Sequence, residues 1–121
     1  MLGYAIVDDD ASMRVALTRL LRVHGINSRS YPSARAFLTA LPSAMPECLI
    51  VDVNMPEMTG LDLQRELLKL GVHVPTVVIT AIEDESVAAD AKSLDAEAFL
   101  TKPMNNTSLM AAINSAVEKR N

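Results

Sequence analysis

The sequence is poor in cysteine and in aromatic residues, and both shortages limit what the chain can be. Its 121 residues include one cysteine, two tyrosines, two phenylalanines and no tryptophan. A single cysteine, Cys48, cannot form a disulfide within the chain, so the cysteine framework of small secreted proteins is excluded. Because 50% of the residues are hydrophobic and only 3% are aromatic, we expect a core of aliphatic side chains and methionine.

Long apolar runs and an excess of basic residues are also missing. No stretch approaches the ~20 apolar residues that a membrane-spanning helix needs. The N-terminal sequence MLGYAIVDDD reaches its acidic residues too early for a secretory signal peptide, so we expect a soluble cytoplasmic protein. The net charge of −4 argues against sequence-independent binding to nucleic acid, which needs a basic face.

Short apolar runs alternate with helical patterns along the chain. The expected strands are residues 4–8, 48–53, 76–80, 98–101 and, as a weak polar edge strand or a loop, 27–31. The strong candidates are continuously apolar, which indicates strands buried on both faces, as in a parallel sheet. A strand–helix unit repeated five times predicts a doubly wound α/β fold. The length suits one domain covering residues 1–121, and we find no linker.

A polar residue stands at the end of each of the four strong strand candidates. These residues are Asp8, Asp52, Thr80 and Lys102, and Asp9 follows Asp8 directly. In an open parallel sheet, ligands bind beyond the carboxyl ends of the strands. If the strand ends are adjacent, several carboxylates, a hydroxyl and an ammonium share one small site.

All of these residues except Asp52 also have an ordinary structural explanation. Acids at 8–10 favour a helix start, and Asp10 can serve only that role. Thr80 alone fits a β-branched strand residue, and Lys102 alone fits a solvated surface lysine. Asp52 is different, because an acid directly after Leu-Ile-Val is unfavourable in a core. The coincidence at four strand ends therefore favours a functional site.

A cluster of carboxylates predicts either a retained proton or a bound cation. Two carboxylates ~4 Å apart repel by about 4 kcal/mol at an effective dielectric near 20. Carboxylates with a backbone carbonyl suit a hard cation such as Mg²⁺, whereas the two histidines fall near helix ends and do not support a zinc site. With Mg²⁺ present, Asp52 can act as a nucleophile toward phosphorus, and Thr80 and Lys102 would bind the phosphoryl oxygens.

Over essentially its whole length, the chain resembles the receiver domain of two-component response regulators. Its VDDD segment resembles the acidic pair of that family, at Asp8 and Asp9, and VDVNMPEMTG resembles the phosphoacceptor loop. The resemblance implies that Asp52 is phosphorylated and that the backbone carbonyl of Asn54 completes a Mg²⁺ or Mn²⁺ site. Thr59 departs from the pattern, because an acid often precedes the loop glycine.

The C-terminal motifs carry the rest of the resemblance. VITA places the switch hydroxyl of the family on Thr80, followed by the small residue Ala81. FLTKP places its lysine on Lys102, and the bond to Pro103 is commonly cis in the family. Phe99 takes the place of the commoner tyrosine, so any contact through that hydroxyl is lost.

The resemblance also implies a fold and a function. The expected fold is flavodoxin-like, with strand order 2-1-3-4-5 and five helices. A sensor histidine kinase would supply the phosphoryl group, and the chain would catalyse only its own phosphorylation and dephosphorylation. Phosphorylation would then switch the face formed by the fourth helix, fifth strand and fifth helix, about residues 84–119, and favour a homodimer. The small residues Ala88, Ala91 and Ala98 would permit close approach there.

The output is expected to be transcription. YPSARAFL and GLDLQRELLKLG look most like the FixJ-type branch, in which a DNA-binding domain usually follows. Residues 1–121 contain no such effector domain, so DNA would be reached only through one outside them. Two alternatives stay open: a phosphatase-class enzyme with an aspartate nucleophile, and a degenerate receiver that acts only as a binding module.

Overall fold

Five strands alternate with five helices in the computed structural model, which describes residues 3–41, 43, 45–81, 85–102 and 104–120. In chain order the elements are β1 (Tyr4–Val7), α1 (Ala11–Val23), β2 (Ser28–Tyr31), α2 (Ala34–Ala40), β3 (Cys48–Asp52), α3 (Gly60–Lys69), β4 (Thr76–Thr80), α4 (Glu85–Ser93), β5 (Ala98–Thr101) and α5 (Asn106–Arg120). All the expected strands are present, and the weak candidate at 27–31 is an edge strand.

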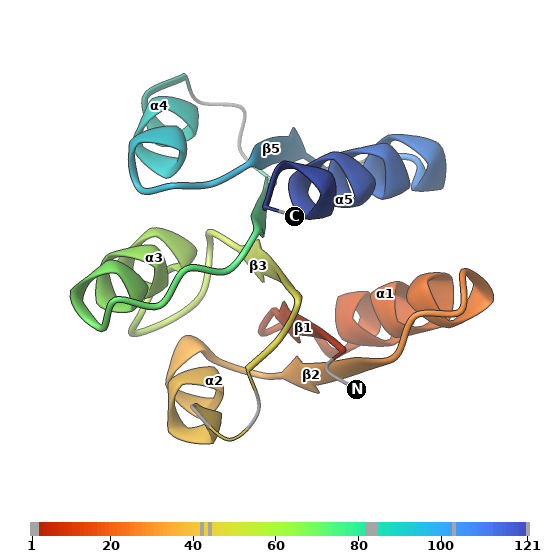
Figure 1. Ribbon diagram of the computed structural model, residues 1–121, viewed down its shortest axis with the longest axis horizontal. Helices are drawn as coiled ribbons and strands as arrows, with labels where there is room; N and C mark the ends of the chain where they lie inside the picture. The colour runs from red at the N-terminus through yellow and green to blue at the C-terminus, as the bar shows by residue number, and fades with distance from the viewer. Residues whose placement is uncertain (1–2, 42, 44, 82–84, 103, 121) are drawn as a thin grey trace.

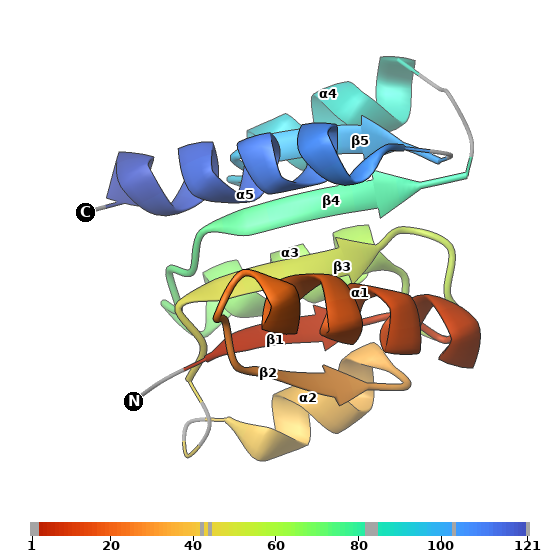
Figure 2. The same cartoon turned by 90° about the vertical axis from the view of Figure 1, so that its right-hand side faces the viewer.

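The strands form one parallel sheet in the order β2-β1-β3-β4-β5. Helices α1 and α5 cover one face, and α2, α3 and α4 cover the other (Figure 1). All five arrowheads point to the same edge of the molecule (Figure 2). This confirms the doubly wound fold and the strand order, and it brings the carboxyl ends of β1, β3, β4 and β5 together.

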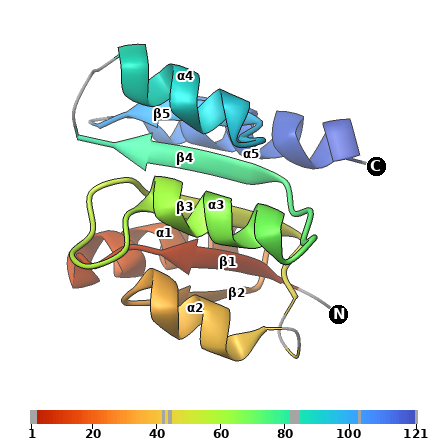
Figure 3. The ribbon, with the colours of Figure 1, turned by 90° about the vertical axis from the view of Figure 1, so that its left-hand side faces the viewer.

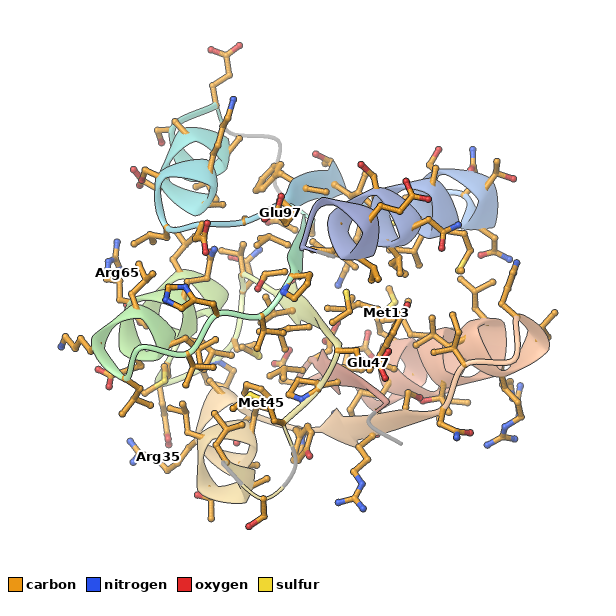
Figure 4. The ribbon with its side chains drawn as sticks, in the orientation of Figure 1. Met13, Arg35, Met45, Glu47, Arg65 and Glu97 are labelled. Atoms are coloured by element: carbon orange, nitrogen blue, oxygen red, sulfur yellow. The ribbon has the colours of Figure 1, made fainter. Side chains whose placement is uncertain are left out.

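The core consists of two aliphatic layers, one on each face of the sheet. Every residue of β3 and of β4 is buried, as their unbroken apolar sequences predicted, whereas the short edge strand β2 is exposed at its centre. Figure 4 shows side chains filling the space between sheet and helices, with Met13 of α1 in the layer shared with α5. The polar residues at the strand ends therefore lie at the rim of an apolar core.

Cys48 begins β3 and belongs to this core. Its side chain is 0% exposed, and burial raises the pKa of the thiol to about 12. The thiol is therefore neutral and behaves as a small apolar side chain.

Side-chain caps fix where the helices begin. The carboxylate of Asp10 accepts hydrogen bonds from the amides of Ser12 and Met13, which confirms its expected role at the start of α1. Ser33 caps α2 in the same way, and the side-chain oxygen of Asn105 accepts from the amide of Ser108, 2.7 Å away, at the start of α5. These caps satisfy amides that have no partner within the helix.

Helices α1, α3 and α4 end in the same backbone motif. Two consecutive amides beyond each helix donate to carbonyls of its last turn, and the residue that carries the first of them has a positive φ. That residue is Gly25 after α1 and Gly71 after α3, but it is Asp95, with φ of 79°, after α4. At the end of α4, Asp95 therefore adopts a conformation that is unfavourable in free energy for a residue with a Cβ atom.

One expected feature of the α4 face is wrong. Ala91 is 0% exposed and belongs to the core layer under α4, so it cannot contribute to a surface. Ala88 is partly buried, and Ala98 packs into the layer on the opposite face of the sheet. Helix α4 must bury one side against the sheet, and its small residues serve that contact.

None of the helices in the described ranges has the length and apolar character needed to cross a bilayer.

Candidate functional site

Three carboxylates meet at the carboxyl edge of the sheet. Asp8 follows β1, Asp9 follows Asp8, and Asp52 ends β3; one oxygen from each lies within 4.8 Å of the others. Asp8 is 2% exposed and Asp52 is 6% exposed, whereas Asp9 is open to solvent. The structure thus brings together the acids that the sequence placed on neighbouring strands, with one of them facing outward.

Backbone contacts hold Asp8 in place. Its amide donates to the carbonyl of Tyr31 at 3.2 Å, and its carboxylate Oδ1 accepts from the amide of Asp10 at 2.9 Å. The guanidinium of Arg14 donates to the Asp8 carbonyl at 2.6 Å. Asp8 is therefore held at its backbone and at Oδ1, while its Oδ2 still faces Lys102.

Lys102 places an ammonium between two of these carboxylates. Its Nζ lies 3.5 Å from Asp8 Oδ2 and 3.7 Å from Asp52 Oδ1, and its side chain is only 20% exposed. The amide of Lys102 also donates to the carbonyl of Thr80 at 2.7 Å, which fixes the start of this side chain. The ammonium is therefore shared between Asp52 and Asp8, and Lys102 is not a solvated surface lysine.

Asp52 has an unusual electrostatic environment. Burial raises the pKa of its carboxyl group above the ordinary aspartate value, and the neighbouring Asp8 charge raises it further. Lys102 and the backbone amide of Asn54 oppose this rise. Asp52 Oδ1 is buried and accepts no hydrogen bond from any described residue. A buried acceptor in this state is suited to a partner that brings positive charge or an electrophilic atom.

The donor set fits a hard divalent cation. Three carboxylates offer oxygen atoms at one point, and Mg²⁺ prefers oxygen ligands and retains several waters. The exposed position of Asp9 leaves room for those waters. The carbonyl of Asn54, two residues beyond Asp52, is the further ligand that the sequence suggested.

Asn54 also makes a contact that sequence reasoning missed. Its side-chain nitrogen Nδ2 donates to the hydroxyl oxygen of Thr80, 3.0 Å away. The sequence assigned a role only to the Asn54 carbonyl, because nothing in one chain shows that residues 26 positions apart share a hydrogen bond. The contact links the loop after Asp52 to the end of β4.

The loop between β3 and α3 is tightly built. A Cβ atom on Gly60 would stand 2.5 Å from the carbonyl oxygen of Asp52, so this position requires glycine. Thr59 and Asp62 form a capping box at the start of α3, and Glu57 has a φ of 68°. Thr59, noted only as a departure from the family pattern, is thus a helix cap; the Thr-x-x-Asp spacing is a signal that could have revealed it.

Thr80 and Phe99 lie on the same face of the sheet. The β4–β5 register pairs Val78 with Phe99 and Thr80 with Thr101. Since side chains alternate along a strand, Val78, Thr80 and Phe99 all face the side covered by α3 and α4. Thr80 is 1% exposed, Phe99 is partly buried, and Ala81 is exposed just beyond the strand. Pro103, and with it the expected cis bond, lies outside the described residues.

The geometry can be compared with known proteins. The family model of the response regulator receiver domain matches residues 5–114. The chain belongs to the response regulator receiver domain family, as its motifs indicated. The family consists of signalling modules, which agrees with the expected class.

Individual relatives support the expected branch. The chain is 41% identical over 113 residues to the response regulator protein TmoT of Ectopseudomonas mendocina. It is 35% identical over 113 residues to the transcriptional regulatory protein FixJ of Rhizobium meliloti, and each alignment covers 93% of this chain. The chain spans about half the length of these curated relatives, 51% of the first and 55% of the second.

Solved structures confirm the fold. The crystal structure of FixJ-N matches with a TM-score of 0.90 and 34% identity, covering 98% of this chain and 94% of that one. A response regulator receiver protein from Burkholderia phymatum matches with a TM-score of 0.81 and 38% identity, covering 96% and 95%.

Proposed function

We propose that Asp52 accepts a phosphoryl group from a phosphohistidine of a sensor histidine kinase. One observation carries this: a buried, unbonded carboxylate oxygen of Asp52 stands beside Lys102 and two further acids at an open sheet edge. An Asp52 oxygen attacks phosphorus, the N–P bond breaks, and its electron pair returns to the imidazole, forming an acyl phosphate. Later attack by water on phosphorus restores the carboxylate and releases inorganic phosphate.

The surrounding side chains support this transfer. Mg²⁺, with Mn²⁺ as an alternative, would be held by Asp9, Asp52 and the Asn54 carbonyl, with Asp8 acting through water, and would neutralise charge on the phosphoryl oxygens. Lys102 gives up part of its contact with Asp52 and pairs with a phosphoryl oxygen. Thr80 turns its hydroxyl from Asn54 toward the same group. In this scheme the chain catalyses only its own phosphorylation and dephosphorylation.

Contacts with the bound phosphoryl group can supply most of the energy that a switch needs. Moving an equilibrium from 1:99 to 99:1 needs about 5.5 kcal/mol of differential binding. Hydrogen bonds to charged groups contribute ~1.5–3 kcal/mol each, so Thr80 and Lys102 together can supply most of it and neither alone is sufficient. Withdrawal of Thr80 vacates space on the α4 side of the sheet, and Phe99, on the neighbouring strand and the same face, turns inward to fill it.

The proposed output depends on the surface that is uncovered when Phe99 turns inward. We infer that α4, β5 and α5 form a homodimer face in the phosphorylated state, and that residues 1–121 constitute one receiver domain. Transcription control is supported by the FixJ relative, which is described as a transcriptional regulatory protein. In this proposal DNA is contacted only by an effector domain outside these residues.

The phosphoacceptor is tested with a small phosphodonor and Mg²⁺. Intact mass measurement should show one added phosphoryl group on the parent and on Asp90→Asn, which changes an exposed acid on α4. The Asp52→Asn variant should gain no phosphoryl group on the peptide that contains position 52. Labelling of that peptide in Asp52→Asn would reject the assignment. Repeated turnover of the donor without accumulation of phosphoprotein would instead indicate a phosphatase.

The switch is tested separately. Sedimentation should show a monomer without, and a dimer with, beryllofluoride and Mg²⁺ as a phosphoryl analogue. Thr80→Ala should bind the analogue and remain monomeric, and Lys102→Ala should accept phosphoryl more slowly and fail to dimerise. Dimerisation of Thr80→Ala equal to the parent would remove the switch and leave the chemistry at Asp52 intact.

A further inference from the structure

A buried glutamine connects α3 to the last turn of α4. Gln64 lies on α3 and is 3% exposed. Its side-chain nitrogen Nε2 donates to the carbonyl of Ala91 at 3.1 Å and to the carbonyl of Leu94 at 3.2 Å. Figure 3 shows α3 and α4 side by side on the face of the sheet that carries this contact. One amide group thus satisfies two carbonyls at the C-terminal end of α4.

The orientation of this amide follows from its surroundings. Both atoms that Nε2 contacts are carbonyl oxygens, which only accept hydrogen bonds. Reversing the amide would bring Oε1 against these two acceptors. In the orientation found, Oε1 is buried without a hydrogen-bond partner among the described residues. A buried amide left half satisfied costs stability, and an apolar residue of similar size would not carry that cost. Gln64 is therefore better explained by what its nitrogen holds than by packing.

Helix α4 has few other attachments. Of its residues Glu85–Ser93, only Ala91 is fully buried, whereas α3 buries five residues. Its N-terminal residues Glu85 and Ser86 are exposed. Burial of apolar area is the main force that holds a helix on a sheet. Val87 and Leu94 are partly buried against the same core layer as Ala91, and two of these three residues lie at the turn that Gln64 contacts.

That turn would be weak without Gln64. The helix ends α1 and α3 have glycine at the position of positive φ, and α4 has Asp95. A residue with a Cβ is disfavoured in this conformation. The carbonyl of Ala91 accepts both from the amide of Ala96, which belongs to the motif, and from Gln64. The glutamine therefore reinforces the motif at the one helix end of the three where glycine is missing.

We propose that Gln64 is a pivot that fixes the C-terminal end of α4 to α3, so that switching displaces the N-terminal half of α4 about this end. Only the displacement of α4 on switching rests on the proposed function; the attachment of α4 to α3 by Gln64 does not. Thr80 ends β4 and Glu85 begins α4, five positions later, so the N-terminal end of α4 is the end nearer to Thr80 along the chain. The opposite end is held by two hydrogen bonds that involve neither Thr80 nor the carboxylate site. Gln64 is thus a positioning residue for the output face.

The pivot is tested first in the protein without any phosphoryl group. Amide hydrogen exchange is compared for the parent, Gln64→Met, Gln64→Glu and Leu63→Val, where Leu63 is a fully buried α3 residue that takes no part in the two hydrogen bonds. In Gln64→Met the amides of Leu94–Ala96 should exchange on the order of tenfold faster, relative to those of α3, because two hydrogen bonds are lost. Gln64→Glu at pH 8 should exceed this, since a carboxylate faces the two carbonyls.

The control separates a pivot from general packing. Leu63→Val should accelerate exchange in α3 and α4 alike. Uniform acceleration in Gln64→Met, or none at Leu94–Ala96, would overturn the proposal.

A second measurement adds beryllofluoride and Mg²⁺. In the parent, exchange should change in residues 85–90 and stay constant at 94–96, whereas in Gln64→Met both segments should change. A parent in which 94–96 changes as much as 85–90 would overturn the pivot. Failure of the parent to bind the analogue would overturn the proposed function, and the exchange measured without the analogue would still decide whether Gln64 holds α4.

Discussion

The side chain of Asn54 donates a hydrogen bond to the hydroxyl oxygen of Thr80, joining the loop after the candidate phosphoacceptor to the end of β4. In the proposed switch this bond must break before Thr80 reaches a phosphoryl oxygen. Asn54 therefore opposes switching as long as Asp52 is unmodified. The same residue would serve the metal through its carbonyl and the resting state through its side chain.

The first prediction concerns this pair. Asn54→Ala and Thr80→Val should each lower stability, and their double-mutant cycle should show a coupling of about 0.5–1.5 kcal/mol, at the low end because Asn54 is exposed. Urea unfolding of the four proteins measures it. Asn54→Ala should also dimerise at a lower concentration of phosphoryl analogue than the parent. A coupling free energy of zero in this double-mutant cycle would mean that the hydrogen bond does not contribute to stability in solution.

The second prediction is a pH dependence of stability set by Asp52. Its folded pKa is raised, chiefly by burial, so folding disfavours its charged form. The stability associated with this group is fully present below the unfolded pKa and is lost as pH rises through the folded pKa. In metal-free buffer at pH 7, Asp52→Asn should therefore melt a few degrees above the parent, and the difference should shrink as pH is lowered toward 4. Thermal melts of both proteins across this range provide the measurement. An equal or lower melting temperature at pH 7 would contradict the burial argument.

The third prediction is that Mg²⁺ stabilises the fold through the three acids. A ligand that binds only the folded state at 100 times its dissociation constant adds about 2.7 kcal/mol. The melting temperature of the parent should therefore rise with Mg²⁺ concentration. Asp9→Ala should show no such rise, whereas Asp10→Ala, which removes a helix cap and no proposed ligand, should melt lower but keep the rise. A rise in Asp9→Ala as large as in the parent would place the ion elsewhere.

The fourth prediction concerns the end of α4. Asp95→Gly should stabilise the protein by about 1 kcal/mol, because glycine adopts a positive φ without the penalty that Asp95 incurs. Loss of the 3.9 Å contact between Asp95 and His73 should matter little, since both side chains are exposed. His73→Asn should accordingly change stability by less than ~0.5 kcal/mol. Chemical denaturation distinguishes the two substitutions, and a destabilised Asp95→Gly would show that the carboxylate matters more than the backbone.

The sequence was most informative where a residue type conflicted with its surroundings. Asp52 after Leu-Ile-Val predicted a site because burying a carboxylate is costly, and the structure places it at 6% exposure beside Lys102. Strands β3 and β4 were identified because both faces are buried and the apolar run is unbroken. These features are local in the chain, and local patterns can be read without coordinates.

Features that depend on partners far apart in the sequence were not predicted. The Asn54–Thr80 bond and the Gln64–Ala91 bond join residues separated by 26 and 27 positions. Ala91 was expected at the surface because small residues permit close approach between partners; the structure buries it completely, on the side of α4 that carries Val87 and Leu94. Residue size alone does not distinguish a helix side that packs on the sheet from one that meets a partner.

The buried thiol of Cys48 has a practical consequence for measuring the motion of α4. It is the only cysteine in the chain, it is fully enclosed, and its pKa of about 12 leaves almost no thiolate at neutral pH. We therefore expect the unsubstituted protein not to react with maleimide or thiol-directed spin-label reagents. A cysteine introduced at the exposed Ala89 would be modified selectively without first removing Cys48. With a second cysteine at the exposed Arg65 on α3, a pair of probes could report the distance between the two helices as the switch is driven.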